Sequence, residues 1–294
     1  MFNMNLIKEI YWMKICDIIY PPFTVAMSVY EKDNDEYLDR ALQSITDLQT
    51  IKPDEIVLVC DGPLTEKLDS VIEKYKKKYN FIRIVRLKYN KGLGNALSIA
   101  VKESKNELIF RMDSDDVSVN DRFEQQLKFF SSFPDVDIIG GDITEFIGEE
   151  ENIVGKRHVP EDNNLIREYM KTRCAMNHVS VMYKKSAILA AGGYKDWFWN
   201  EDYYLWIRML LNGAVFANTG TVLVNVRVGK EMYNRRGGIK YFKSELGIQN
   251  YMLKNKIIGI NIYLINIIIR IIVQILLPNK IRGLVFRTLA RERN

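Results

Sequence analysis

Residues 107–116 read ELIFRMDSDD, and this stretch decides the fold. Its first six positions are mostly apolar, as expected of a strand buried on both faces of a parallel sheet. Three aspartates follow within four positions, namely Asp113, Asp115 and Asp116. Ionised carboxylates at this spacing repel one another, so we expect a positive charge to lie among them.

Three more apolar runs precede this stretch and alternate with helical patterns. Strand-like runs lie at 23–29, 55–60 and 81–87, and helical patterns lie over roughly 36–48, over roughly 66–79 and after Gly92. This alternation predicts an α/β fold, a mostly parallel sheet with helices on both faces. The second half is less regular. Its clearest pattern, at 200–213, predicts an amphipathic helix with Asn200 as N-cap and Gly213 as C-cap.

The composition is that of a folded globular protein. The chain has 294 residues, with 47% hydrophobic and 27% charged residues, enough for one large α/β domain or two small ones. Its three cysteines are far apart, which fits neither a disulfide framework nor a zinc site and favours a reducing compartment. Two histidines leave little room for a histidine-based metal site.

Charge is distributed unevenly along the chain. From Arg227 onward there are fourteen Lys/Arg against three Asp/Glu, a balance of +11, whereas the preceding part carries −6. A basic tail predicts an anionic partner, such as a membrane surface, a phosphate-bearing substrate or nucleic acid. The first 22 residues have charges within their apolar pattern and no uninterrupted apolar core, so they are read as an extension rather than a signal peptide.

Polar or conformationally special residues follow each of the four predicted strands. They are Tyr30-Glu31, Asp61-Gly62, Asn90-Lys91-Gly92 and the aspartates from Asp113. In parallel sheets, ligands bind beyond the carboxyl ends of the strands. We therefore expect a binding site at this edge. Solvated turns that cap helices would explain any one of these strand ends, but explain all four less well.

The aspartates suit a divalent cation that prefers oxygen ligands. Mg²⁺ or Mn²⁺ fits better than Zn²⁺, and Mg²⁺ usually completes its coordination with water and substrate phosphates. The sequence does not fit an EF-hand calcium-binding loop starting at Asp113. Such a loop needs a ligand at its fifth position and glycine at its sixth, but these positions are Val117 and Ser118. The alternative is that Asp116 and Asp121 only cap a helix beginning near Asn120.

The ordered set of motifs resembles an inverting glycosyltransferase of family 2 with the GT-A fold. The set comprises residues 25–31, Asp61-Gly62, NKGLGNAL at 90–97, DSDD at 113–116 and NEDYYLWIR at 200–208. The resemblance covers residues 23–227, about two-thirds of the chain. It is greatest to bacterial enzymes that extend O-antigen or capsule units on a lipid carrier. It implies a GT-A-type, Rossmann-like domain at 23–230, followed by a C-terminal region at 231–294.

The resemblance also implies roles for individual residues. Asp113 and Asp115 match the motif that holds the donor ribose and a Mn²⁺ or Mg²⁺ ion, and Asp202 matches the catalytic base. Nucleotide-binding positions are implied for the strand-end residues Tyr30, Glu31, Asp61, Asn90 and Lys91, with Asp61 reading the uracil ring. Direct displacement needs a base at the acceptor hydroxyl, opposite the departing UDP. Without the resemblance, Asp202 reads as a carboxylate that stabilises the first turn of its helix.

The implied activity is transfer of a sugar from a UDP-sugar to a lipid-diphosphate-linked saccharide. The implied place is the cytoplasmic face of the plasma membrane, with peripheral attachment. Two alternatives remain open at this point. One is a nucleotidyltransferase of related fold, although no Gly-rich basic phosphate loop follows the first strand. The other is a non-catalytic scaffold at the membrane surface.

The most apolar part of the chain lies at 256–283. Its length approaches that of a membrane span, but Lys256, Asn266, Arg270 and Gln274 form one polar stripe on the predicted helix. An amphipathic helix lying in the membrane interface is favoured over a buried core helix or a true span. Its isoleucines favour lipid over nucleic acid, and the basic residues after it would attract anionic lipids.

Overall fold

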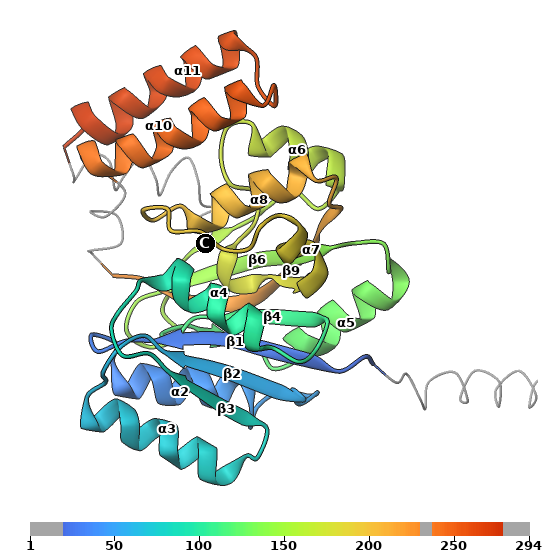
Figure 1. Cartoon of the computed structure of the whole chain (residues 1–294), viewed down its shortest axis with the longest axis vertical. Helices are drawn as coiled ribbons and strands as arrows, with labels where there is room; N and C mark the ends of the chain where they lie inside the picture. Colours follow the sequence, from blue (N-terminus) through green and yellow to red (C-terminus); the bar gives the residue numbers. More distant parts are fainter. Residues whose placement is uncertain (1–19, 230–236, 279–294) are drawn as a thin grey trace, which may run out of the picture.

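The computed structural model describes residues 20–229 and 237–278. Residues 1–19 of the predicted extension at 1–22, and residues 230–236 and 279–294 of the basic tail, lie outside these ranges. Within them, one sheet has the strand order β3-β2-β1-β4-β8-β6-β9-β5, with β7 paired to β6. Figure 1 shows this sheet with helices on both sides.

The first half folds as the alternation predicts. The parallel strands are β1 (Phe23–Val29), β2 (Glu55–Cys60), β3 (Ile82–Arg86) and β4 (Leu108–Met112), and the helices between them are α2 (Asp35–Ile45), α3 (Glu66–Lys78) and α4 (Leu93–Glu103). All strand and helix predictions here are confirmed to within a few residues. Because these strands run in the same direction, their carboxyl ends meet at one edge.

The second half extends the sheet with strands of mixed direction. These are β5 (Val117–Ser118), β6 (Ile138–Phe146), β7 (Ile153–Arg157), β8 (Met182–Lys184) and β9 (Phe216–Arg227). Strand β8 is antiparallel to both β4 and β6, so it reverses the direction of the sheet beside the aspartates. The helices are α5 (Arg122–Ser132), α6 (Asn163–Met170), α7 (Lys185–Ala190) and α8 (Glu201–Leu211), with the short turn η1 (His178–Ser180).

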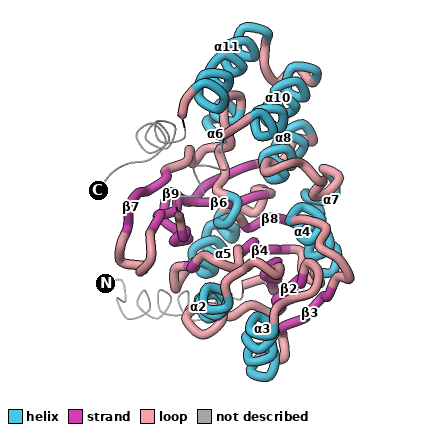
Figure 2. The backbone as a smooth tube through the Cα atoms, turned by 90° about the vertical axis from the view of Figure 1, so that its left-hand side faces the viewer, coloured by secondary structure: helices cyan, strands magenta, loops and turns pink. Residues whose placement is uncertain are grey.

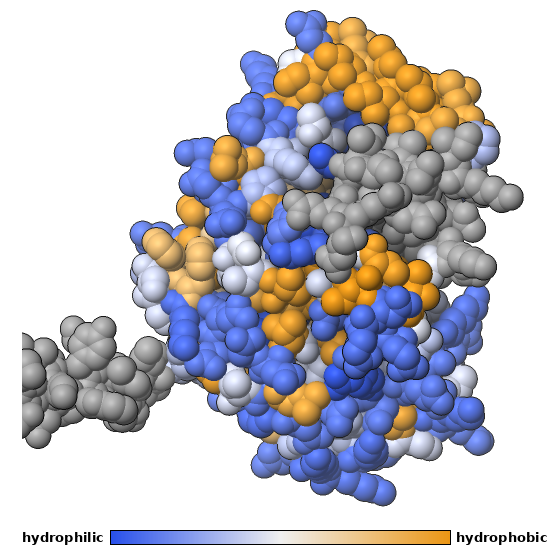
Figure 3. Space-filling view, turned by 180° about the vertical axis from the view of Figure 1, so that it is seen from behind, coloured by the Kyte–Doolittle hydropathy of each residue, from blue (hydrophilic) through white to orange (hydrophobic). Residues whose placement is uncertain are grey.

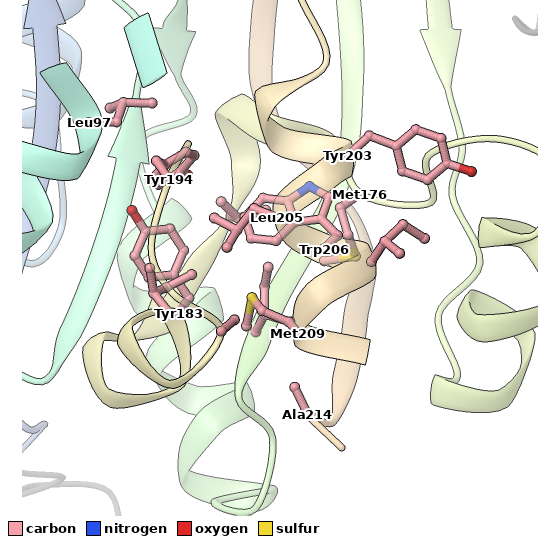
Figure 4. Close-up of a cluster of buried hydrophobic side chains, with 14 of the residues drawn as sticks. Leu97, Met176, Tyr183, Tyr194, Tyr203, Leu205, Trp206, Met209 and Ala214 are labelled. Atoms are coloured by element: carbon pink, nitrogen blue, oxygen red, sulfur yellow. The ribbon is translucent and has the colours of Figure 1, made fainter. Parts of the chain in front are cut away.

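The sheet has a separate hydrophobic core on each face. Alternate residues of β1 divide between them: Val25 and Met27 pack with α2, α3 and α5, while Ala26 packs with α4 and α8. Trp206 of α8 is fully buried in the second core, and Figure 4 shows it among Leu205, Met209 and Tyr183. This packing fixes the N-terminus of α8 above the carboxyl edge of the strands.

Two C-terminal helices form a hairpin beside α6 and α8 at one end of the molecule (Figures 1 and 2). They are α10 (Ile239–Lys254) and α11 (Ile260–Arg270), and α11 continues into the π-helical turn η2 (Ile271–Leu276). The sequence predicted one helix whose polar stripe faces water or lipid headgroups, and this is wrong. Asn266, Arg270 and Gln274 are buried against the protein body. Among the described residues, the structure has no helix with the length and apolarity to cross a membrane.

Candidate active site

A cavity of about 860 Å³ lies at the carboxyl edge of the strands. Residues far apart in the sequence line it: the loop after β4, strands β6 and β9, the segment 172–179, the start of α8, and the hairpin of α10 and α11. It contains both Asp113 and Asp202. The predicted metal-binding and base residues, 89 positions apart, therefore open into the same space.

Asp113 is held by an arginine from its own strand. Both guanidinium Nη atoms of Arg111 donate to the two carboxylate oxygens of Asp113, and Arg111 is almost fully buried. A bidentate pair of this kind fixes the carboxylate plane. Arg111 thus supplies part of the positive charge that the aspartates require.

The negative charge of the clustered carboxylates exceeds the single positive charge of Arg111. Asp113, Asp115 and Asp116 each offer an oxygen within 4.8 Å of the others, and Asp33 lies beside them because Ser114 Oγ donates to Asp33 Oδ2 at 2.8 Å. Burial and the charges of Asp113 and Asp33 raise the pKa of Asp115 to about 6. Burial and the charges of Asp115 and Asp113 raise the pKa of Asp116 well above its usual range. Burial is the first cause of both raised pKa values, and repulsion between the carboxylates adds to it. A hard divalent cation among these oxygens would offset that repulsion, so the donor set fits such an ion.

The helix-capping alternative for these aspartates is wrong. Asp121 stands at the N-cap of α5 but makes no side-chain bond to the helix backbone there, and instead accepts from Gln125 Nε2 at 2.8 Å. Asp116 accepts from the backbone N–H of Arg227 at 2.8 Å. The Arg227 guanidinium packs 3.8 Å from the ring centre of Tyr37. Asp116 thus joins β9 to the aspartate loop.

The first turn of α8 presents two carboxylates to the cavity, from Glu201 and Asp202. Burial raises the pKa of Asp202, while the backbone N–H of Tyr203 and the charges of Arg111 and Arg157 lower it. Burial and the charge of Asp202 raise the pKa of Glu201 to about 7. Asn200 stands at the N-cap as predicted, but its side chain donates to Ser244 Oγ of α10 at 3.1 Å. A carboxylate with a raised pKa in a cavity is suited to accept a proton.

The other predicted nucleotide-binding residues lie beside the cavity rather than in its wall. Asp61 is buried, and its two oxygens accept the backbone N–H groups of Lys91 at 2.7 Å and Gly92 at 2.9 Å. Each oxygen retains a second lone pair for a ligand. Asn90 Oδ1 accepts from Gly92 N at 3.1 Å. Asp61 therefore orders the loop that follows β3.

The first strand ends near the aspartates. The N–H of Tyr30 donates to Asp33 Oδ2 at 3.1 Å, and Glu31 is exposed in the following turn. Gly62, with φ of +96°, follows the second strand, and a Cβ there would lie 2.8 Å from Asn90 N. Only glycine permits so close an approach of these two strand ends.

Close packing links the start of α4 to the segment that leads into α8. A Cβ on Gly94 would lie 3.1 Å from the carbonyl oxygen of Lys195 and 3.5 Å from Glu201 Cβ. The absence of a side chain at Gly94 lets α4 contact the segment that carries Glu201 and Asp202.

Several residues of the site were missed from the sequence. One feature of the sequence could have identified Arg111 as a site residue. It is a charged residue inside a buried strand, and such a residue needs a partner nearby. Arg157, Arg173 and Glu245 line the cavity from segments without a recognisable motif. Their place in the cavity follows from tertiary packing alone.

Comparisons with known proteins agree with this geometry. The family model for glycosyl transferase family 2 matches residues 24–198. The chain is 38% identical over 274 residues to an Escherichia coli UDP-Gal:α-D-GlcNAc-diphosphoundecaprenol β-1,3-galactosyltransferase, covering 92% of this chain and 98% of that protein. It is 37% identical over 232 residues to the amylovoran biosynthesis glycosyltransferase AmsE of Erwinia amylovora, covering 79% of this chain and 85% of that protein.

The fold is also that of a known glycosyltransferase. The crystal structure of residues 1–349 of S. aureus TarS in complex with UDP-GlcNAc superposes with a TM-score of 0.62 at 18% identity, covering 85% of this chain and 72% of that one. The family match sets aside the nucleotidyltransferase and scaffold alternatives. The chain is a GT-A-like glycosyltransferase and belongs to glycosyl transferase family 2.

Proposed function

We propose that this glycosyltransferase moves a sugar from a UDP-sugar to a hydroxyl of a lipid-diphosphate-linked saccharide during assembly of a surface polysaccharide such as O-antigen or capsule. The observation that carries the proposal is the cavity that contains both Asp113 and Asp202. The E. coli relative, similar over nearly its whole length, supports the substrate class.

In this proposal, the carboxyl edge of the strands binds the donor. Asp113 and Asp115 hold a Mn²⁺ or Mg²⁺ ion and the donor ribose, and Arg111 fixes the orientation of Asp113. A divalent ion bound there would stabilise the negative charge that develops on the departing diphosphate. Asp61 accepts an N–H of the uracil ring, and Tyr30, Glu31, Asn90 and Lys91 surround the nucleotide.

Asp202 acts as the general base. Its carboxylate takes the proton of the acceptor hydroxyl while that oxygen bonds to the anomeric carbon and the bond from this carbon to the UDP oxygen breaks. Attack opposite the leaving group inverts the configuration, so an α-linked UDP-sugar yields a β-linkage. The start of α8 is rigidly packed through Trp206, which keeps the carboxylate in position for this transfer.

Release of UDP tests the proposed function. The full chain is incubated with UDP-galactose, UDP-glucose and UDP-GlcNAc in turn, each with a detergent-solubilised lipid-diphosphate-GlcNAc acceptor and Mn²⁺. We expect acceptor-dependent UDP release from one donor, and its loss on addition of EDTA. Acceptor-dependent release that persists undiminished in EDTA would contradict the metal role, and release from none of these donors would contradict the proposed substrates.

We also propose that the protein attaches peripherally to the cytoplasmic face of the membrane through α11 and η2. Figure 3 shows an apolar patch over this end of the molecule. The exposed side chains of α11 and η2 are Ile260, Leu264, Ile265, Ile268, Ile269, Ile272, Ile275 and Leu276. The buried polar stripe faces the body, so the apolar face points outward, and such a large patch marks an interaction surface. The reducing compartment inferred from the cysteines supports attachment to the cytoplasmic face rather than to the outer face.

Vesicle flotation tests the attachment. Wild-type chain is mixed with vesicles of phosphatidylethanolamine and phosphatidylglycerol, and compared with a Leu264→Glu/Ile268→Glu variant. These side chains are 51% and 56% exposed, so the fold should persist. We expect at least about 100-fold weaker binding, because two buried apolar side chains contribute roughly 1.5–3 kcal/mol each. Leu165→Glu, at an equally exposed position of α6, is the matched control. Equal flotation of all three proteins would refute the attachment.

A further inference from the structure

The proposed function gives no role to the side of the cavity near α11. Its wall comes from the segment 172–174 and from α10 and α11. These parts are bonded together, since Arg270 Nη2 donates to the Thr172 carbonyl at 2.8 Å and Asn266 Nδ2 donates to the Lys171 carbonyl at 2.9 Å. The hairpin therefore fixes the position of the cavity wall that faces away from the aspartates.

Four arginines line the cavity, and three of them have polar partners that occupy their guanidinium groups. Arg111 pairs with Asp113, and Arg270 Nε lies 2.6 Å from Glu245 Oε2. Arg157 donates to Asn177 Oδ1 and to the Cys174 carbonyl. These three therefore have little capacity to bind a further anion.

Arg173 differs from the other three. Its side chain is exposed, its guanidinium packs 4.7 Å from the ring centre of Tyr169, and within residues 20–229 and 237–278 no carboxylate forms an ion pair with it. Stacking on an aromatic ring orients a guanidinium while leaving its N–H groups available. The cavity thus has an oriented cation with unused donors.

In the chain, Arg173 lies between a residue bonded to α11 and a residue close to Asp202. The preceding residue, Thr172, is bonded to α11, and the charge of Asp202 contributes to the raised pKa of the following residue, Cys174, although burial is the larger cause. Ile265 and Ile269 of α11 line the cavity and are still 55% and 52% exposed. The cavity therefore opens beside the apolar face of α11.

From this arrangement we propose that Arg173 binds the diphosphate of the lipid-linked acceptor. The inference rests on the proposed function and assigns the acceptor subsite. A guanidinium binds phosphate oxygens through paired N–H donors. The sugar attached to that diphosphate then reaches Asp202, and the lipid chain leaves the cavity over Ile265 and Ile269. Arg173 acts in binding and takes no part in the proton transfer.

Acceptor kinetics test the role of Arg173. With the lipid-diphosphate-linked acceptor, Arg173→Ala should raise the acceptor KM about 10- to 150-fold, the loss expected for a charge-assisted hydrogen bond. The donor KM should not change, and Arg173→Lys should recover part of the loss. With an alkyl glycoside acceptor that lacks the diphosphate, wild type and Arg173→Ala should be equal. Arg167→Ala, from helix α6 outside the cavity wall, is the matched control.

A binding measurement separates this inference from the proposed function. Farnesyl diphosphate, a lipid diphosphate without a sugar, is titrated into the full chain, with farnesol as the uncharged comparison. We expect wild type to bind the diphosphate more tightly than farnesol, and Arg173→Ala to lose that preference. If Arg173→Ala keeps the preference, or if wild type has none, the subsite is refuted even when sugar transfer is observed. If transfer fails while the preference holds, only the proposed reaction is refuted.

Discussion

Replacing Asp202 by Asn is expected to lower kcat about 10²- to 10⁴-fold, the usual contribution of a general base. The amide keeps the shape of the side chain but cannot accept the proton. Because the proposed function places Asp202 at the acceptor hydroxyl, the donor KM should remain close to that of wild type. Steady-state UDP release with a saturating acceptor measures both parameters. Glu201→Gln is the matched control, since it neutralises the neighbouring carboxylate, and it should retain more activity than Asp202→Asn.

The raised pKa of Asp202 gives this prediction a pH dependence. Burial disfavours the charged form, so wild-type kcat/KM should fall as the pH drops through that raised pKa. The free energy of unfolding changes with pH in the opposite direction to kcat/KM. It rises as the pH drops, because the buried carboxylate opposes folding when it is charged, at any pH above the folded pKa. Asp202→Asn should therefore unfold at a higher temperature than wild type at about pH 8. The difference should shrink as the pH falls to about 3, where the carboxyl is largely protonated in the unfolded chain as well.

Two results would remove Asp202 from the mechanism. One is a kcat within a few-fold of wild type in Asp202→Asn. The other is a larger loss in Glu201→Gln, which would assign the base to Glu201. Its pKa of about 7 makes Glu201 the only reasonable substitute in the first turn of α8.

Replacing Asp115 by Asn is expected to remove the response to metal and to lower kcat/KM for the donor about 10²- to 10³-fold, comparable with loss of other groups that stabilise developing charge. Asp115 has the most solvent-exposed surface of the three, although the surrounding protein atoms still partly desolvate its carboxylate, and Arg111 already engages Asp113. Asp115 therefore offers the most accessible oxygen to an incoming metal–diphosphate. Activity is titrated with Mn²⁺ in wild type and variant.

Thermal unfolding provides a readout that does not depend on turnover. Mn²⁺ should raise the Tm of wild type, because it binds only the folded site, and should leave that of Asp115→Asn unchanged. In EDTA the variant should be at least as stable as wild type, since one repelling carboxylate is gone. Asp121→Asn, eight residues from Asp113 and outside the cluster, is the control and should behave as wild type. If Mn²⁺ does not change the Tm of wild type, a metal site at these aspartates is excluded.

Local sequence was sufficient for most of the parallel half of the fold. Apolar runs such as 23–29 and 55–60 bury both faces of a strand, and the helical patterns between them permit only crossover connections. The strand ends follow from the same rule, so Asp61 and Asp113 could be assigned to one edge of the sheet. The position of β8 between β4 and β6 could not be predicted, because the pairing of a strand with distant strands depends on tertiary contacts that the local sequence does not encode.

The sequence by itself determined the fold class and the aspartate cluster, because short-range patterns encode strands and the turns that follow them. Asp202 became a candidate base only through the resemblance of the ordered motifs to glycosyltransferase family 2. Only the tertiary structure decided what surrounds them. Arg111 pairs with Asp113, Arg173 lines the same cavity as Asp202, and the polar stripe at Asn266 and Arg270 faces inward. Periodicity shows which residues share a helix face, but it cannot show what that face contacts. That depends on packing between α11 and the segment at 171–172, about 95 positions earlier in the chain.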